Sequence, residues 1–76
     1  MNWEEHITVD AAILVGKPVI KGTRLAVEFV VGLFAQGWSE DEVLRNYPGL
    51  TKEAIRACFA YAQEHLSQEH LYTVPA

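Results

Sequence analysis

Three residues that break or redirect a helix, Gly16, Pro18 and Gly22, fall close together in the first third of this 76-residue chain. A helix cannot pass through Pro18, because proline has no backbone N–H and its ring clashes with the preceding turn. The residues on either side are β-rich: His6 to Val9 alternate polar and apolar, and Val19 to Lys21 form a second short run. We therefore expect a β arm at the N-terminus.

Two points within this arm, which we place at residues 1–25, stay open. The apolar residues 11–15 suit either a turn of helix or an apolar loop. Gly22-Thr23 suits the centre of a type II′ turn, which takes glycine at its first central position. The strand could equally continue through Gly22, where the missing side chain lets another backbone come close.

After Ala26 the apolar residues follow the spacing of a helix instead. The first helical stripe consists of Val27, Val30, Val31, Phe34 and Ala35. Gly37 suits the end of this helix, since glycine readily takes the left-handed conformation found there. Ser39 and Glu42 are spaced as a capping box and predict the start of a second helix. The apolar face of this second helix would hold Val43, Leu44 and Tyr47.

Pro48-Gly49 suits the end of the second helix, and Thr51 suits the N-cap of a third helix of about 15 residues. The apolar face of the third helix is predicted at Ile55, Phe59, Ala62 and Leu66. Two helices joined by a tight turn that contains glycine form a helix-turn-helix. We expect a mainly α fold, a three-helix bundle of this type behind a short β arm or hairpin. It would form one domain over residues 1–66, followed by a C-terminal tail over residues 67–76.

The charge of the chain is unevenly distributed. Residues 11–27 contain three cations and no acid, so this segment is +3, and the total of −4 leaves −7 for the rest. An acidic total argues against a plain basic DNA-binding domain, whose isoelectric point usually exceeds about 9. Half of the residues are hydrophobic, which is high for a small fold and favours a subunit interface, so we expect a homodimer.

A lone cysteine, Cys58, gives no sign of an oxidising compartment. No apolar run approaches the roughly 20 residues that span a membrane. We therefore expect a cytoplasmic protein without a membrane partner.

The start of the third helix is the first candidate site. Residues at this place in a helix-turn-helix meet base edges or phosphates, and here they are Thr51, Lys52 and Arg56. Lys52 and Arg56 are four apart and share a helix face. The alternative is a solvated face on which these cations pair with Glu53. Two cations are also few for strong phosphate binding unless other elements or a second copy add more.

The polar side chains of the arm are the second candidate site. They could bind phosphates or an acidic pocket of a protein, and they are Lys17, Lys21, Thr23 and Arg24. Alternatively, Gly16, Pro18 and Gly22 would shape a hairpin whose cations only protect a sheet edge from aggregation. The residues by themselves do not decide between these interpretations.

Metal binding and catalysis find little support in the sequence. The soft ligands His6, His65, His70 and Cys58 show no zinc-like spacing. Nucleophilic catalysis would need a hydroxyl or thiol beside a base, and Ser39 and Thr51 are already assigned to helix caps. We expect neither a metal nor a cofactor, and we expect a protein that is not an enzyme.

Three stretches together resemble the bacterial family called domain of unknown function 433. They are Gly16-Lys17-Pro18-Val19-Ile20-Lys21-Gly22-Thr23-Arg24-Leu25, then Gly37-Trp38-Ser39 with Glu42-Val43-Leu44 and Tyr47-Pro48, and then Leu50-Thr51-Lys52-Glu53 with Ile55, Ala57, Tyr61 and Ala62. The resemblance implies a homeodomain-like three-helix fold with a β arm. Family members often have proline at the position of Ala26, where proline would suit the first turn of the helix.

The resemblance also implies a function. Many members of the family look like antitoxins of type II toxin–antitoxin pairs, which neutralise a PIN-like ribonuclease toxin and often bind their own operator double-stranded DNA as dimers. The acidic site of such a toxin would receive Arg24 first and Lys21 second, and residues 71–74 could order on the same partner. A dimeric protein-interaction adaptor without DNA binding is the alternative.

Overall fold

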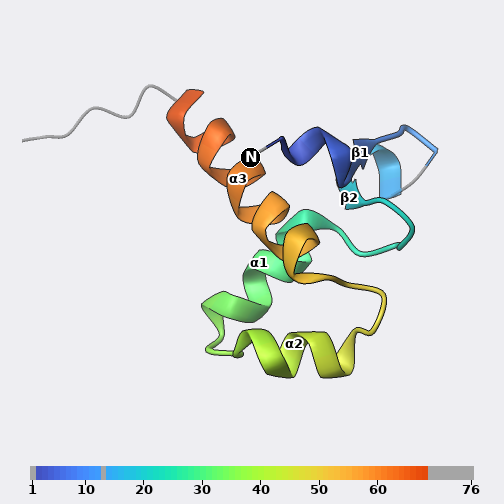
Figure 1. Cartoon of the computed structure of the whole chain (residues 1–76). Coiled ribbons are helices and arrows are strands. Elements are labelled where there is room, and N and C mark those ends of the chain that lie inside the picture. The colour runs from blue at the N-terminus through green and yellow to red at the C-terminus, as the bar shows by residue number, and fades with distance from the viewer. Residues whose placement is uncertain (1, 13, 69–76) are drawn as a thin grey trace, which may run out of the picture.

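A short β hairpin precedes three helices in the computed structural model of this chain, which describes residues 2–12 and 14–68 (Figure 1). The elements are η1 Trp3–Glu5, β1 Ile7–Val9, η2 Leu14–Gly16, β2 Pro18–Ile20, α1 Val27–Ala35, α2 Glu40–Asn46 and α3 Lys52–Gln68, where η marks a 3-10 helix. This arrangement confirms the predicted mainly α fold with an N-terminal β arm.

The two strands form an antiparallel pair in which Ile7 faces Ile20 and Val9 faces Pro18. This register brings the buried side chains of Ile7 and Ile20 to the same place in the core. The chain is not extended over all of residues 1–10, because the 3-10 turn η1 precedes β1. The Asn2 side chain accepts a hydrogen bond from the backbone N–H of Glu4 and starts that turn.

A tight turn follows β2, so the strand does not continue through Gly22. The Thr23 N–H donates to the Ile20 carbonyl at 3.1 Å and closes a β-turn over residues 20–23. Lys21 and Gly22 are the two central residues of this turn. Gly22 therefore occupies the second central position, with φ +80° as a type II turn requires, and not the first position of a type II′ turn. The chain then runs back along β2, because the Ile20 N–H donates to the Leu25 carbonyl at 3.0 Å.

The segment before β2 has an unusual backbone. Leu14, Val15 and Gly16 have φ angles of 47°, 56° and 79° and so lie in the left-handed region. The sequence left a helical turn or an apolar loop open here, and the structure shows a left-handed turn instead. Such a conformation is rare for leucine and rarer for β-branched valine.

The helix ends follow the predicted capping residues. Beyond α1, Gly37 has φ +96° and its N–H donates to the Phe34 carbonyl, while the Trp38 N–H donates to the Leu33 carbonyl, which is a Schellman motif. Ser39 and Glu42 form the predicted capping box of α2. The Thr51 hydroxyl accepts a hydrogen bond from the Ala54 N–H at 3.0 Å and caps α3.

The core lies where α1 and α3 meet the hairpin, with one residue of α2. Its buried members are Ile7, Ile20, Val27, Val30, Leu33, Val43, Leu50, Ala54, Ile55, Ala57 and Cys58. The predicted face of α3 is only partly correct, because Phe59 and Leu66 are exposed. The predicted stripe of α1 likewise includes Ala35, which is exposed. The small residues Ala54, Ala57 and Cys58 turn toward the body instead and let α3 approach closely.

α3 continues to Gln68, beyond the predicted domain boundary at residue 66. Residues 69–76, which contain most of the predicted tail and the segment 71–74, lie outside the described residues. Among the helices that the structure describes, none has the length and apolar character needed to cross a membrane.

Candidate partner-binding site on the arm

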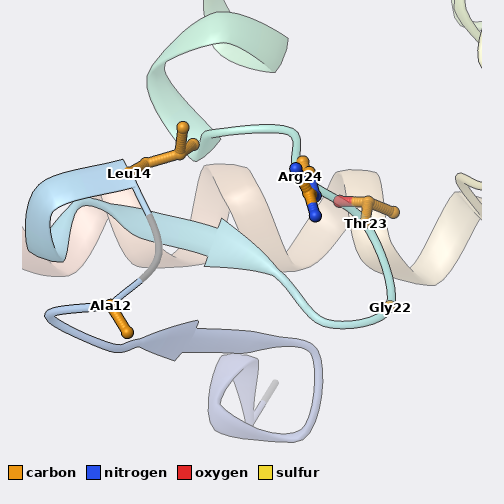
Figure 2. A pocket seen from close by; sticks show the side chains of 5 residues that line it. All are labelled: Ala12, Leu14, Gly22, Thr23 and Arg24. Atoms are coloured by element: carbon orange, nitrogen blue, oxygen red, sulfur yellow. The ribbon is translucent and has the colours of Figure 1, made fainter.

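A surface hollow of about 600 Å³ lies on the arm, lined by Ala12, Leu14, Gly22, Thr23 and Arg24. Figure 2 shows Ala12 in the loop after β1 and Leu14 at the start of η2, across from the segment 22–24 that follows β2. The hollow thus lies between two segments that flank β2 in the sequence, and the turn after β2 directs the second segment back along that strand, because the Ile20 N–H donates to the Leu25 carbonyl.

The three arm cations have different surroundings. Lys17 pairs with Glu28 in the first turn of α1, and this is the ion pair found within residues 2–12 and 14–68. Lys21 Nζ donates to the Glu4 carbonyl at 2.9 Å and so ties the turn to η1. Arg24 is exposed at the hollow and has no hydrogen bond or ion pair to any described residue. Arg24 is therefore the arm cation that these contacts leave available.

Thr23 fixes the turn that presents Arg24. Its hydroxyl donates to the Ile20 carbonyl at 2.8 Å and accepts from the Leu25 N–H at 3.0 Å. These two bonds hold the backbone on both sides of Arg24. Thr23 also lines the hollow, but its hydroxyl is already engaged in these two hydrogen bonds.

The other wall of the hollow is apolar and strained. Leu14 lines it and is exposed, and the neighbouring Val15 is 96% exposed. Both have positive φ, a conformation that costs on the order of 1–3 kcal/mol for a residue other than glycine. The sequence pattern does not single out Val15, because an apolar run such as residues 11–15 normally indicates burial.

The start of α3 adjoins the arm. A Cβ placed on Gly49 would lie 3.6 Å from the Thr23 methyl carbon, so the α2–α3 turn touches the turn after β2. Figure 1 shows these two turns on the same side of the molecule. Lys52 and Arg56 are exposed, as predicted, and neither forms an ion pair with Glu53 among the described residues.

The residues predicted to shape the backbone do so. Gly16 and Gly22 have positive φ, and Pro18 begins β2 at the end of the strand pair. The Leu50 N–H donates to the Tyr47 carbonyl at 2.9 Å across Pro48-Gly49 and closes the turn before α3. Within the described part of the chain, no three side chains of His, Cys, Asp or Glu gather as metal ligands.

The chain matches known proteins along most of its length. It is 39% identical over 59 residues to an uncharacterized protein, y4eO, of Sinorhizobium fredii strain NBRC 101917 / NGR234, covering 78% of this chain and 27% of that protein. The crystal structure of a DUF433 member protein from Anabaena variabilis ATCC 29413 superposes with a TM-score of 0.75 at 34% identity, covering 82% of this chain and 61% of that one. The chain thus spans only part of either relative.

The family model described as protein of unknown function DUF433 matches residues 7–62, from β1 into the middle of α3. This match takes in the hollow, Arg24 and the start of α3. The chain belongs to the DUF433 family.

Proposed function

We propose that this chain is the antitoxin-like component of a type II toxin–antitoxin pair, a binding module that neutralises a PIN-like ribonuclease toxin. The observation that carries the proposal is Arg24, an exposed cation without a described partner, beside a hollow with an exposed apolar wall. The resemblance of the arm and helix junction to the family supplies the class of partner.

The chemistry of the hollow suits an acidic site on a protein. A PIN-like active site gathers carboxylates around Mg²⁺, and a guanidinium binds carboxylates through two parallel hydrogen bonds. Leu14 and Val15 would pack on apolar groups beside these carboxylates and exclude water from the contact. A charged anchor inside an apolar rim is the arrangement that concentrates binding energy in a few residues.

Arg24→Ala tests this role in the full chain, with the toxin as the partner. We expect toxin affinity to fall at least about 30-fold, the loss that follows removal of one partner of a buried charge pair. Lys17→Ala is the matched control, because Lys17 already pairs with Glu28 and should leave affinity within about threefold. Unchanged affinity and inhibition for Arg24→Ala, in a variant with native circular dichroism, would refute the assignment.

A second proposed role is binding of operator DNA through residues at the start of α3. Thr51, Lys52 and Arg56 stand at the beginning of the second helix of the helix-turn-helix, and both cations are exposed. A gel-shift assay with the upstream DNA, with and without the toxin, tests this role. We expect retardation that weakens steeply with salt and is lost in the Lys52→Ala, Arg56→Ala double variant. No retardation in either case leaves the alternative, a dimeric protein-interaction adaptor.

A further inference from the structure

The short turn η1 joins two parts of the molecule that are far apart in the sequence. At one end, the Trp3 ring packs edge-on against Tyr61 of α3 with 4.8 Å between the ring centres, and the Trp3 indole N–H donates a hydrogen bond to Glu64. At the other end, the Glu4 carbonyl accepts a hydrogen bond from Lys21 Nζ at 2.9 Å. η1 thus connects the C-terminal half of α3, beside which it lies in Figure 1, to the turn after β2.

The attachment of η1 is superficial. No residue of η1 is buried. The firmly held part of the chain begins directly after it, because the Lys21 N–H donates to the His6 carbonyl at 2.8 Å and Ile7 is 3% exposed in the core. Segments with few buried apolar contacts open at a much lower free energy than the whole fold. Residues 2–5 can therefore detach with His6 as the hinge while the core stays intact. We call residues 2–5 the strap.

The strap also brings negative charge to the arm. Glu4 and Glu5 add two carboxylates to the turn whose backbone holds the Lys21 ammonium. Lys21 and Arg24 are the cations of the segment 21–24. Opposite charge on the strap and on this segment favours the attached state, and the bond to Glu4 leaves Arg24 as the cation that the segment offers to a partner.

We propose that the strap gates Lys21. The structure shows the closed state, in which the Lys21 ammonium is bonded to the Glu4 carbonyl. In the open state the strap leaves α3 and releases Lys21, so the arm offers an anionic partner two cations instead of one. Trp3 is the anchor of the closed state, because its ring and its indole N–H both contact α3.

The two ends of the strap are coupled in this proposal. Both contacts exist only in the closed state, so weakening either one shifts the same equilibrium and releases the other. A change at Trp3 should therefore appear at Lys21, and a change at Lys21 should appear at Trp3. The coupling belongs to the chain alone, so it can be tested without a toxin or DNA and stands or fails separately from the proposed function.

Acetylation of the lysine side chains in the full chain, followed by mass spectrometry, tests the anchor. We expect Trp3→Ala to raise the acetylation rate of Lys21 at least about fivefold, the factor that corresponds to the loss of one ordinary aromatic pair. Lys17 is the internal reference, because it pairs with Glu28 and should keep its rate. Val9→Ala is the matched control, since it removes an exposed apolar side chain from the same hairpin. Lys21 should react in Val9→Ala as it does in the wild type.

Two results of this experiment overturn the proposal. One is a Lys21 that reacts equally fast in the wild type, Trp3→Ala and Val9→Ala. The other is a Trp3→Ala variant in which Lys17 and Lys21 accelerate together, because the fold would then have loosened as a whole.

A second measurement starts from the Lys21 end of the strap. Trp3 and Trp38 are the two tryptophans of the chain, so Trp38→Phe leaves Trp3 as the source of tryptophan fluorescence. In this background Lys21→Met removes the ammonium but keeps an unbranched side chain. We expect acrylamide to quench Trp3 more strongly, with a quenching constant shifted toward that of the unfolded chain. Lys17→Met is the matched control, because it removes an arm cation that pairs with Glu28 and not with the strap. Equal quenching in Lys21→Met and Lys17→Met overturns the proposal.

Discussion

Val15 combines two unfavourable properties in one residue. It is β-branched with φ 56°, and 96% of its surface is exposed. Neither property benefits the isolated fold, since the conformation is strained and the exposed side chain gains nothing from burial. Both are explained if Val15 presents its side chain to a partner beside Arg24.

Val15→Gly should therefore stabilise the chain and weaken binding. Glycine adopts positive φ without strain, so we expect a gain of about 1 kcal/mol in the free energy of unfolding, measured by urea denaturation. Gly16→Ala is the opposite control, because alanine at φ 79° should lose about 1 kcal/mol. Toxin affinity should fall in Val15→Gly despite its higher stability. A less stable Val15→Gly variant would show that the left-handed turn carries no strain.

Cys58 should be inert in the native protein. It is fully buried, and this burial raises the pKa of its thiol from 9.0 to about 11. Near pH 8 the thiolate fraction is then about a hundredfold lower than that of an ordinary thiol, before access is considered. We expect alkylation by iodoacetamide to be at least a hundredfold slower in buffer than in concentrated guanidinium chloride. A second cysteine introduced by Ser67→Cys, on the exposed part of α3, should react quickly in buffer. Equal rates at the two sites would contradict the buried assignment.

The ends of α1 and α2 could be predicted from local sequence. The Schellman motif at Gly37 and the capping box at Ser39 involve residues within a few positions of one another, so their spacing was enough to predict them. The face of α3 is different, because two apolar stripes compete and periodicity does not say which one meets the body. The small residues Ala54, Ala57 and Cys58 are buried together with Ile55, whereas Phe59 and Leu66 of the predicted stripe are exposed.

The candidate site depended still more on tertiary contacts. Three arm cations are equivalent in sequence, and only the contacts of Lys17 with Glu28 and of Lys21 with Glu4 distinguish them from Arg24. The left-handed turn at Leu14 and Val15 could not be predicted either, since neither residue favours positive φ.

The capping box predicts a dependence of stability on pH. The backbone N–H of Ser39, and then its hydroxyl, lower the pKa of Glu42 from 4.5. A carboxyl whose pKa is lower in the folded state stabilises the fold above its unfolded pKa and loses this contribution as pH falls through the folded pKa. We expect Glu42→Gln, which keeps an oxygen acceptor, to be less stable than wild type at pH 7. The difference in urea midpoint should shrink toward zero below pH 4.5. A difference that does not change with pH would contradict the role of the charge.

Ser39→Ala removes the other half of the capping box. We expect it to cost about 1 kcal/mol of the free energy of unfolding, the usual loss for an N-cap serine. Unlike Glu42→Gln, it should remain less stable on both sides of pH 4.5, since the hydroxyl does not titrate there. Urea denaturation at the same two pH values measures both variants.

The start of α3 leads to a prediction about how many copies of the chain bind operator DNA. Each copy would offer Lys52 and Arg56 to phosphates, so two copies would offer four α3 cations and one copy two. At about −0.9 per phosphate contact, the slope of log affinity against log salt should be about −3.6 if two copies bind and about −1.8 if one copy binds. Lys17→Ala should keep the wild-type slope, because Lys17 already pairs with Glu28. Fluorescence anisotropy of labelled operator DNA over a salt series measures these slopes, and a flat response would remove the DNA role.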